Sequence, residues 1–274
     1  MVSLPVQAFG YSPPPTPPAP AQAVGFTKLL RRNVFTSLSG FDLSNTGVDG
    51  FDWYLRFAWP SVASDATGKA HWAAFTANSS GNLSIANGSL LISGAAPSSN
   101  LAIASACYSS TDGRGYVGTL LPRSFYAESS IVWAGYSYGQ SAFWSMPLRF
   151  LNGTANTDFV EQDWAEPGDL GGCVGNCVHQ GALQWHIDGT LLGAGPLVQS
   201  SPNPVGSETH LWGALCMAPA DNTGTSLYHV YLDNVKQTLP GGDGIGLDIL
   251  DTDRWIIYYS GGLTTASCDF WVPP

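Results

Sequence analysis

Short apolar segments closed by turn residues recur along most of this chain, and this pattern limits the fold more than any other feature. Segments rich in β-branched and aromatic residues occupy residues 89–94, 101–108, 125–136, 182–189, 211–218, 226–234 and 254–260. Most of them are bounded by Gly, Asn, Asp or Ser. Segments of this length and content are typical of strands. Residues 226–234 also show the period of two of a half-buried strand, with Leu227, His229 and Tyr231 on one face and Tyr228, Val230 and Leu232 on the other.

Composition and length favour one large all-β domain. Gly 32 and Pro 19 make up about a fifth of the 274 residues, only 11% are charged, and 44% are hydrophobic, which is enough for a sizeable core. The single helix-like segment covers residues 26–35 and is at most two or three turns long, so a doubly wound α/β fold has no support. We predict an antiparallel β-sandwich, a jelly roll, over residues 25–274.

The first residues differ in composition from the rest. Seven of the 19 prolines precede residue 25, so residues 1–24 are expected to form an extended, semi-rigid tether without a core. A secretory signal needs a basic start and an apolar run, and neither is evident before Lys28. Either a signal was trimmed or this chain never had one; we expect a secreted, extracellular protein.

The charge balance limits the partners. Lys+Arg 10 against Asp+Glu 20 gives a net charge of -10, which repels phosphate backbones and anionic lipid headgroups. No apolar stretch reaches the roughly 18 to 20 residues that a membrane span requires. We therefore expect no nucleic acid partner, no membrane, and a monomer.

Five cysteines leave the redox state open. Cys173 and Cys177 lie in a glycine-rich loop, where a disulfide and buried thiols are equally good interpretations. Cys107, Cys216 and Cys268 are far apart in sequence. A zinc site is less favoured. His179 follows Cys177 closely, but no paired CxxC or HxxxH spacing surrounds it, and a structural zinc ion needs four converging N or S ligands.

The acidic segment 158–169 is the strongest candidate for chemistry. It holds five of the chain's twenty carboxylates. On a regular strand Glu161 and Asp163 point the same way, about 7 Å apart, whereas Glu166 points to the opposite face. A β-bulge at Trp164 or Ala165 would shift the parity and place all three carboxylates in a row on one face.

Such a row suits one reaction class. Two glutamates leaning toward one substrate bond bring their carboxyl groups to about 5 to 5.5 Å, the separation found in retaining glycosidases. Asp163 between them would hydrogen-bond one neighbour, and the crowded negative charges would push one carboxyl toward its protonated form. The phosphate-binding motif GxxxxGK[ST] and the metal-binding motif HExxH are absent from the sequence.

The motif Glu161-Gln-Asp163-Trp-Ala-Glu166 resembles the ExDxxE of bulged members of glycoside hydrolase family 16, retaining β-glucanases and galactanases. Six flanking segments resemble further motifs of that family in the same order: 87–93, 125–128, 142–144, 178–181, 210–213 and 230–234. The resemblance implies that Glu161 is the nucleophile, Glu166 the general acid and base, and Asp163 the residue that tunes the nucleophile.

The chain departs from the family pattern at several positions. The family usually has Gly before the first Glu and an apolar residue after it, where this chain has Val160 and Gln162, and Ala165 replaces a frequent Met. If Gln162 points into the core, it needs a hydrogen-bond partner. Gln140 stands where a sugar-stacking tryptophan is usual.

Aromatic and polar side chains near the motif are the candidates for sugar contacts, because flat rings suit the C–H faces of pyranoses. These candidates are Trp144, Trp164, His179, Trp185 and Trp133. A place in the core is the alternative for each of them.

The leading hypothesis is therefore a retaining endo-glycosidase that hydrolyses a β-linked polysaccharide, with a β-1,3-glucan or a related neutral glucan as substrate. A transglycosylase uses the same chemistry and stays open. A non-catalytic, lectin-like sandwich is the alternative, and a structural adhesion domain is a third reading. We expect no cofactor: related sandwiches often hold a structural calcium, and the turn 243–248 has oxygen ligands, but no spacing demands a metal.

Overall fold

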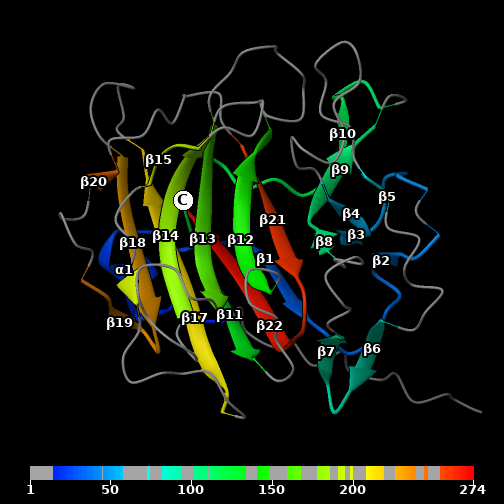
Figure 1. The fold of residues 1–274 in the computed structure, drawn as a ribbon, viewed down its shortest axis with the longest axis horizontal. Helices are drawn as coiled ribbons and strands as arrows, with labels where there is room; N and C mark the ends of the chain where they lie inside the picture. The colour runs from blue at the N-terminus through cyan, green and yellow to red at the C-terminus, as the bar shows by residue number, and fades with distance from the viewer. Residues whose placement is uncertain are drawn as a thin grey trace, which may run out of the picture.

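Two large β-sheets lie face to face in this protein (Figure 1). The computed structural model describes residues 15–44, 46–57, 73–74, 82–93, 102–109, 112–133, 141–148, 159–167, 178–185, 191–194, 198–199, 208–218, 226–238, 244–245 and 254–274. Within these ranges the regular structure is almost entirely strand. The predicted jelly-roll sandwich is therefore confirmed.

The first sheet has nine strands in the order β19-β18-β17-β11-β22-β7-β6, with β1 also pairing β22 and β20 pairing β18. Its pairs are all antiparallel. Its strands are β1 (Lys28–Val34), β6 (Leu83–Ala86), β7 (Ser89–Ile92), β11 (Phe125–Val132), β17 (His210–Met217), β18 (Ser226–Leu232), β19 (Val235–Lys236), β20 (Gly244–Ile245) and β22 (Leu263–Val272).

The second sheet also has nine strands, in the order β15-β14-β13-β12-β21-β8-β3-β2, with β16 pairing β14. Its strands are β2 (Phe41–Asp42), β3 (Trp53–Tyr54), β8 (Ala102–Ala104), β12 (Ala142–Pro147), β13 (Phe159–Pro167), β14 (Val178–Trp185), β15 (Leu191–Ala194), β16 (Val198–Gln199) and β21 (Trp255–Ser260). Two smaller pairs complete the fold: β4 (Arg56–Phe57) with β5 (Ala73–Ala74), and β9 (Ala106–Tyr108) with β10 (Tyr116–Gly118).

The core lies between the two sheets and explains the alternation in the sequence. In β18, Tyr228 and Val230 are fully buried in this core, whereas Leu227 on the other face is 39% exposed. In β21, Trp255, Ile257 and Tyr259 belong to the core cluster. The strand period of two therefore decides which side chains are left for the outer face of each sheet.

Residues 26–35, expected to be helical, form strand β1 instead. Strand β1 pairs antiparallel with β22 from Lys28 to Val34, with a register shift between Leu29 and Arg31. A short amphipathic segment has only a weak helical preference, and the hydrogen bonds of an open sheet edge override it.

The N-terminal segment differs from the expected tether at its end. Residues 19–23 form helix α1 (Ala19–Ala23), and Ala21 is fully buried in a second apolar cluster with Tyr126, Leu215 and Trp271 on the outer face of the first sheet. The folded unit therefore begins before Gly25, because a small side chain fits against these large rings.

Two tight turns in the first sheet use the residue types that such turns require. Asn87 (φ 52) and Gly88 (φ 71) join β6 to β7, and Asp233 (φ 51) and Asn234 (φ 64) join β18 to β19. Two successive positive φ angles match the right-handed twist of a two-residue hairpin, and Asn, Asp and Gly tolerate them best. Among the described residues, no helix has the length and apolarity to cross a membrane.

Candidate active site

Strand β13 carries the three carboxylates of the acidic motif. Its pairing with β14 joins Glu161, Asp163 and Glu166 to three alternate residues of that strand, namely Leu183, Gly181 and His179. Alternate residues of a strand share a face, and residues paired across two antiparallel strands point the same way. Glu161, Asp163 and Glu166 therefore lie in a row on one face of the second sheet.

A bulge produces this arrangement. The register with β14 shifts between Asp163 and Glu166, so that three steps along β13 match two along β14. The pairing with β12 shifts at the same place, with Phe143 opposite Ala165 and Trp144 opposite Asp163. Both neighbours thus locate one extra residue in β13 at Trp164 or Ala165, as the sequence predicted.

The row faces away from the core between the sheets. Val160 and Ala165 of β13 belong to the core cluster, whereas the three acidic residues do not. Glu161 is 8% exposed and Asp163 is 3% exposed, so both carboxyl groups are shielded from water even though they lie outside the core. A groove above the row stays a prediction.

Burial changes the protonation of the row. Burial, followed by the negative charges of Glu161 and Glu166, raises the pKa of Asp163 well above its usual range. Burial also raises the pKa of Glu166 to about 7. A carboxyl with such a pKa holds a proton in neutral solution, which a general acid requires.

Aromatic rings continue the row across the sheet. Trp144 of β12 pairs with Asp163 on one side and with Tyr258 of β21 on the other. The rings of Trp144 and Tyr258 are stacked, with centroids 4.5 Å apart and an interplanar angle of 22°. Trp144 was predicted from the sequence and Tyr258 was not, although the alternation in residues 254–260 separates Tyr258 from the core-facing Tyr259.

His179 and Trp185 lie on β14, beside the acidic strand. His179 pairs with Glu166, shares the face of the acidic row and is fully buried. Trp185 pairs with Phe159 at the end of the same strand, and its side chain is outside the described part of the chain. Contact of either residue with a sugar stays a prediction.

Trp164 and Trp133, both expected as sugar contacts, lie in the core. Trp164 is fully buried, with ring centroids 4.8 Å from Phe143 and 5.5 Å from Phe125 of the opposite sheet. Trp133 is 1% exposed and packs against Trp212 at 6.2 Å. Both expectations are corrected: Trp164 directly follows the outward-facing Asp163 and therefore points to the inner face of the second sheet, and Trp133 follows β11 on the inner face of the first sheet.

Gln162 points into the core and has the partners it needs there. Its Oε1 accepts a hydrogen bond from Trp164 Nε1 at 3.2 Å, and its Nε2 donates to Cys216 Sγ at 3.7 Å. A buried amide with both ends bonded costs little, so this departure from the family pattern is accommodated. Gln140 lies outside the described residues.

The metal and thiol candidates named from the sequence lie only partly within the described residues. In the described ranges no three His, Cys, Asp or Glu side chains are grouped so that they would hold a metal ion. Of the turn expected to offer calcium ligands, only residues 244–245 are described, and Cys173 and Cys177 are outside the description. Cys107, Cys216 and Cys268 are buried, and none of the three forms a disulfide within the described part of the chain.

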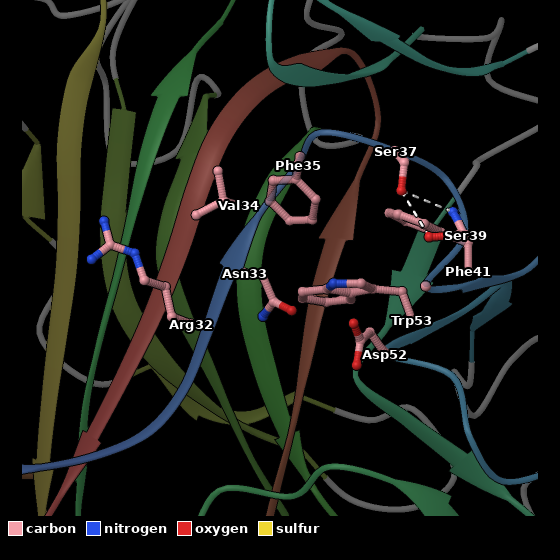
Figure 2. A pocket seen from close by; sticks show the side chains of 10 residues that line it. Arg32, Asn33, Val34, Phe35, Ser37, Ser39, Phe41, Asp52 and Trp53 are labelled. Carbon is pink, nitrogen blue, oxygen red and sulfur yellow. Dashed lines mark hydrogen bonds between the residues drawn. The ribbon is translucent and has the colours of Figure 1, made fainter. Parts of the chain in front are cut away.

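A cavity of about 240 Å³ lies at the edge of the sandwich (Figure 2). It is lined by residues 32–35, Ser37, residues 39–41, Asp52 and Trp53. Figure 2 shows the Ser37 and Ser39 hydroxyls bonded to each other, at 2.8 Å, on its upper rim. Arg31 forms an ion pair with Asp52 beside it. No lining residue belongs to β12, β13 or β14, so this cavity is separate from the acidic row.

Comparison with known proteins finds likeness in structure and not in sequence. No protein-family model and no curated protein matches the sequence. A laminarinase from Flavobacterium sp. UMI-01 has a similar structure, with a TM-score of 0.52 and 12% identity over 89% of this chain and 100% of that one. A GlcNAcα1-4Gal-releasing endo-β-galactosidase from Clostridium perfringens gives a TM-score of 0.53 and 14% identity over 97% of this chain and 65% of that one.

A third similar structure is LamAcat from Zobellia galactanivorans, with a TM-score of 0.50 and 13% identity over 91% of this chain and 99% of that one. At these sequence identities the similarity shows a shared backbone fold. The fold implied by the resemblance to glycoside hydrolase family 16 is confirmed: this chain shares the two-sheet jelly roll of the laminarinase and the endo-β-galactosidase.

Proposed function

We propose that this protein is a retaining endo-glycosidase that hydrolyses a β-linked polysaccharide. The observation that carries the proposal is the bulge in β13, which places Glu161, Asp163 and Glu166 on one face of the sheet. A glutamate that attacks the anomeric carbon and a glutamic acid that donates a proton, both on one face of a strand, are the minimum equipment for glycoside hydrolysis with retention.

The reaction would proceed in two displacements. In the first, the Glu161 carboxylate attacks the anomeric carbon while Glu166 gives its proton to the glycosidic oxygen, so that the bond to the leaving sugar breaks and a glycosyl ester of Glu161 forms. In the second, the Glu166 carboxylate takes a proton from a water molecule. The oxygen of that water then attacks the anomeric carbon, which releases Glu161 and regenerates the protonated Glu166.

The environment of the row supports this division of roles. Glu166 has a pKa raised to about 7 by burial, which keeps it protonated for the first step. Asp163, between the two glutamates, has its pKa raised well above its usual range, first by burial and then by the charge of Glu161 and Glu166. A protonated Asp163 would donate a hydrogen bond to Glu161 and stabilise the negative charge that returns to Glu161 when the glycosyl ester is hydrolysed.

A neutral glucan is the first substrate to test. The similar Flavobacterium structure is a laminarinase, and laminarin is a β-1,3-glucan, so we place this linkage first. The net charge of -10 also disfavours a sulfated galactan. The stacked rings of Trp144 and Tyr258 lie beside Asp163 and would form an apolar wall of the sugar site, with His179 on the opposite side next to Glu166.

The deciding experiment is product analysis on a panel of β-glucans and galactans, with Glu161→Gln as the blank. We expect internal cleavage that releases oligosaccharides of several lengths, and a first product with the β configuration in time-resolved proton NMR. Glu161→Gln and Glu166→Gln are each expected to lower kcat/KM by about 10³-fold or more while the protein stays folded, because each removes a group that acts only in the transition state. Full activity in either variant would contradict the assignment.

A lectin-like protein is the alternative outcome of the same panel. It would retain a polysaccharide on a column and yield no new reducing ends after long incubation. Secretion is part of the proposal, because a polymeric glucan meets an enzyme outside the cell.

A further inference from the structure

At the bulge in β13, buried side chains donate hydrogen bonds to backbone carbonyl groups. Gln180 of β14 donates from its Nε2 to the carbonyl oxygen of Trp164 at 2.7 Å. Tyr228 of β18 donates from its Oη to the carbonyl oxygens of Asp163 at 3.3 Å and Gly181 at 3.0 Å. The backbone of the bulge is thus bonded to two buried side chains, one of them from the opposite sheet.

These side chains also tie the bulge to the opposite sheet at other points. The same Nε2 of Gln180 donates to the carbonyl oxygen of Tyr231 on β18 at 3.3 Å. Gln162 connects the indole of Trp164 with Cys216 on β17. Gln162, Gln180 and Tyr228 are fully buried, so no water competes for these hydrogen bonds. We call these three residues the brace.

The position of the bulge decides the chemistry of the face above it. The extra residue lies between Asp163 and Glu166. If the bulge moved one place toward the N-terminus, Asp163 would become part of it and leave the row. If the bulge were lost, the parity of the strand would turn Glu166 toward the core. The backbone pairing of β13 with β14 requires only that β13 contain one extra residue. The hydrogen bonds to the carbonyl oxygens of Asp163 and Trp164 determine where along β13 this residue lies.

We propose that Gln180 and Tyr228, assisted by Gln162, are positioning residues that hold the bulge at Trp164 and thereby keep Glu166 in line with Glu161 and Asp163. This inference rests on the proposed function for its kinetic consequence, but its structural content stands apart from it. The brace touches backbone atoms and the indole of Trp164, so it acts on the carboxylates only through the strand.

The kinetic test uses Gln180→Met and Tyr228→Phe, which keep the volume of each side chain and remove its donors. We expect kcat to fall by about tenfold or more with KM changed less than about twofold, because misplacement of a catalytic group weakens the transition state more than substrate binding. The alkaline limb of the pH profile is expected to move to lower pH, because a displaced Glu166 is less buried and its pKa is then raised less.

The chain offers a matched control in Tyr259. Tyr259 is also fully buried in the core and bonds across the sheets, with its Oη donating to Ser129 at 2.6 Å. It lies on β21, and no hydrogen bond joins its hydroxyl to β13 in the described structure. Tyr259→Phe is expected to lose a similar amount of stability while kcat and the pH profile stay unchanged.

A second readout does not depend on activity. The sequence has only four glutamates, Glu128, Glu161, Glu166 and Glu208, so carboxyl-¹³C-labelled glutamate gives four signals that Glu→Gln variants assign. The titratable groups that face Glu166 are Asp163 and Glu161 on its own strand and His179 on β14. In Gln180→Met and Tyr228→Phe the Glu166 signal is expected to titrate at least about one pH unit below its wild-type midpoint. It should not move in Tyr259→Phe.

The outcomes separate the two proposals. If the wild-type protein cleaves none of the panel, the proposed function fails, and the ¹³C titration still decides the brace. If the wild-type protein is active but the brace variants keep its kcat, its pH profile and its Glu166 titration, only the positioning role is wrong. Equal changes in Tyr259→Phe would assign the effect to general loosening of the core and would also overturn the inference.

Discussion

At the scale of single residues, burial raises the pKa of two glutamates that lie on different sheets. Glu166 on the second sheet and Glu128 on the first sheet each have a pKa raised to about 7, in both cases mainly by burial. For Glu128 the charge of Asp269 raises the pKa further, whereas the hydrogen bond from Tyr126 lowers it. The two groups allow activity and stability to be tested separately.

The pH dependence of catalysis is expected to follow Glu166. A general acid works only while protonated, so kcat/KM should fall as the pH rises through about 7, the value to which burial raises the pKa of Glu166. Initial rates on a soluble glucan between pH 4 and 9 check this. Glu128→Gln should leave this limb in place, and a limb near pH 9 would contradict the role of Glu166.

The pH dependence of stability is expected to include Glu128. Its pKa is raised in the folded protein, so its contribution is fully present below the unfolded value of about 4.5 and is lost as the pH rises through about 7. Glu128→Gln should therefore raise the free energy of unfolding at pH 8 by on the order of 2 kcal/mol and change it little at pH 4. Urea titrations at both pH values measure this, with the exposed Glu208→Gln as control. An equal effect at both pH values would contradict the prediction.

At the scale of elements, the local sequence pattern predicts that a segment is a strand but does not predict which strand it pairs with. The alternation in residues 226–234 predicted a half-buried strand with two separate faces, and the structure places Tyr228 and Val230 of β18 in the core. Residues 26–35 were wrongly expected to be helical, because the edge of β22 that they pair with is more than 230 positions away in the sequence. Trp164 was assigned to the outer face although alternation from Asp163 already places it on the inner face, where it is buried.

Helix α1 provides a test of the docked N-terminal segment. Ala21 is fully buried against the first sheet, whereas Ala23 of the same helix is exposed. Ala21→Leu is expected to lower the free energy of unfolding by about 1–3 kcal/mol, because the larger side chain overfills its site. Ala23→Leu should change it by less than about 0.5 kcal/mol. Equal effects in urea titrations would mean that this helix does not rest on the sheet.

At the scale of the whole molecule, charge is expected to separate substrates that share a backbone shape. The chain carries a net charge of -10, which repels a sulfated galactan and leaves a neutral glucan unaffected. Raising the salt concentration from about 20 mM to about 300 mM shortens the Debye length and should increase kcat/KM on sulfated polymers relative to neutral ones. A ratio that is independent of salt in reducing-end assays would contradict this reading.

The sequence alone was sufficient for the class of fold, for several of the strands and for the bulge itself, because each rests on a local rule. Turn residues end segments, side chains alternate, and one extra residue repairs the parity of an acidic strand. Only the tertiary structure decided which aromatic rings lie beside the acids, where the first strand pairs, and what satisfies Gln162 and the carbonyls under the bulge. Those contacts join β12, β13 and β14 to β17, β18 and β21, and no local pattern specifies how distant strands stack.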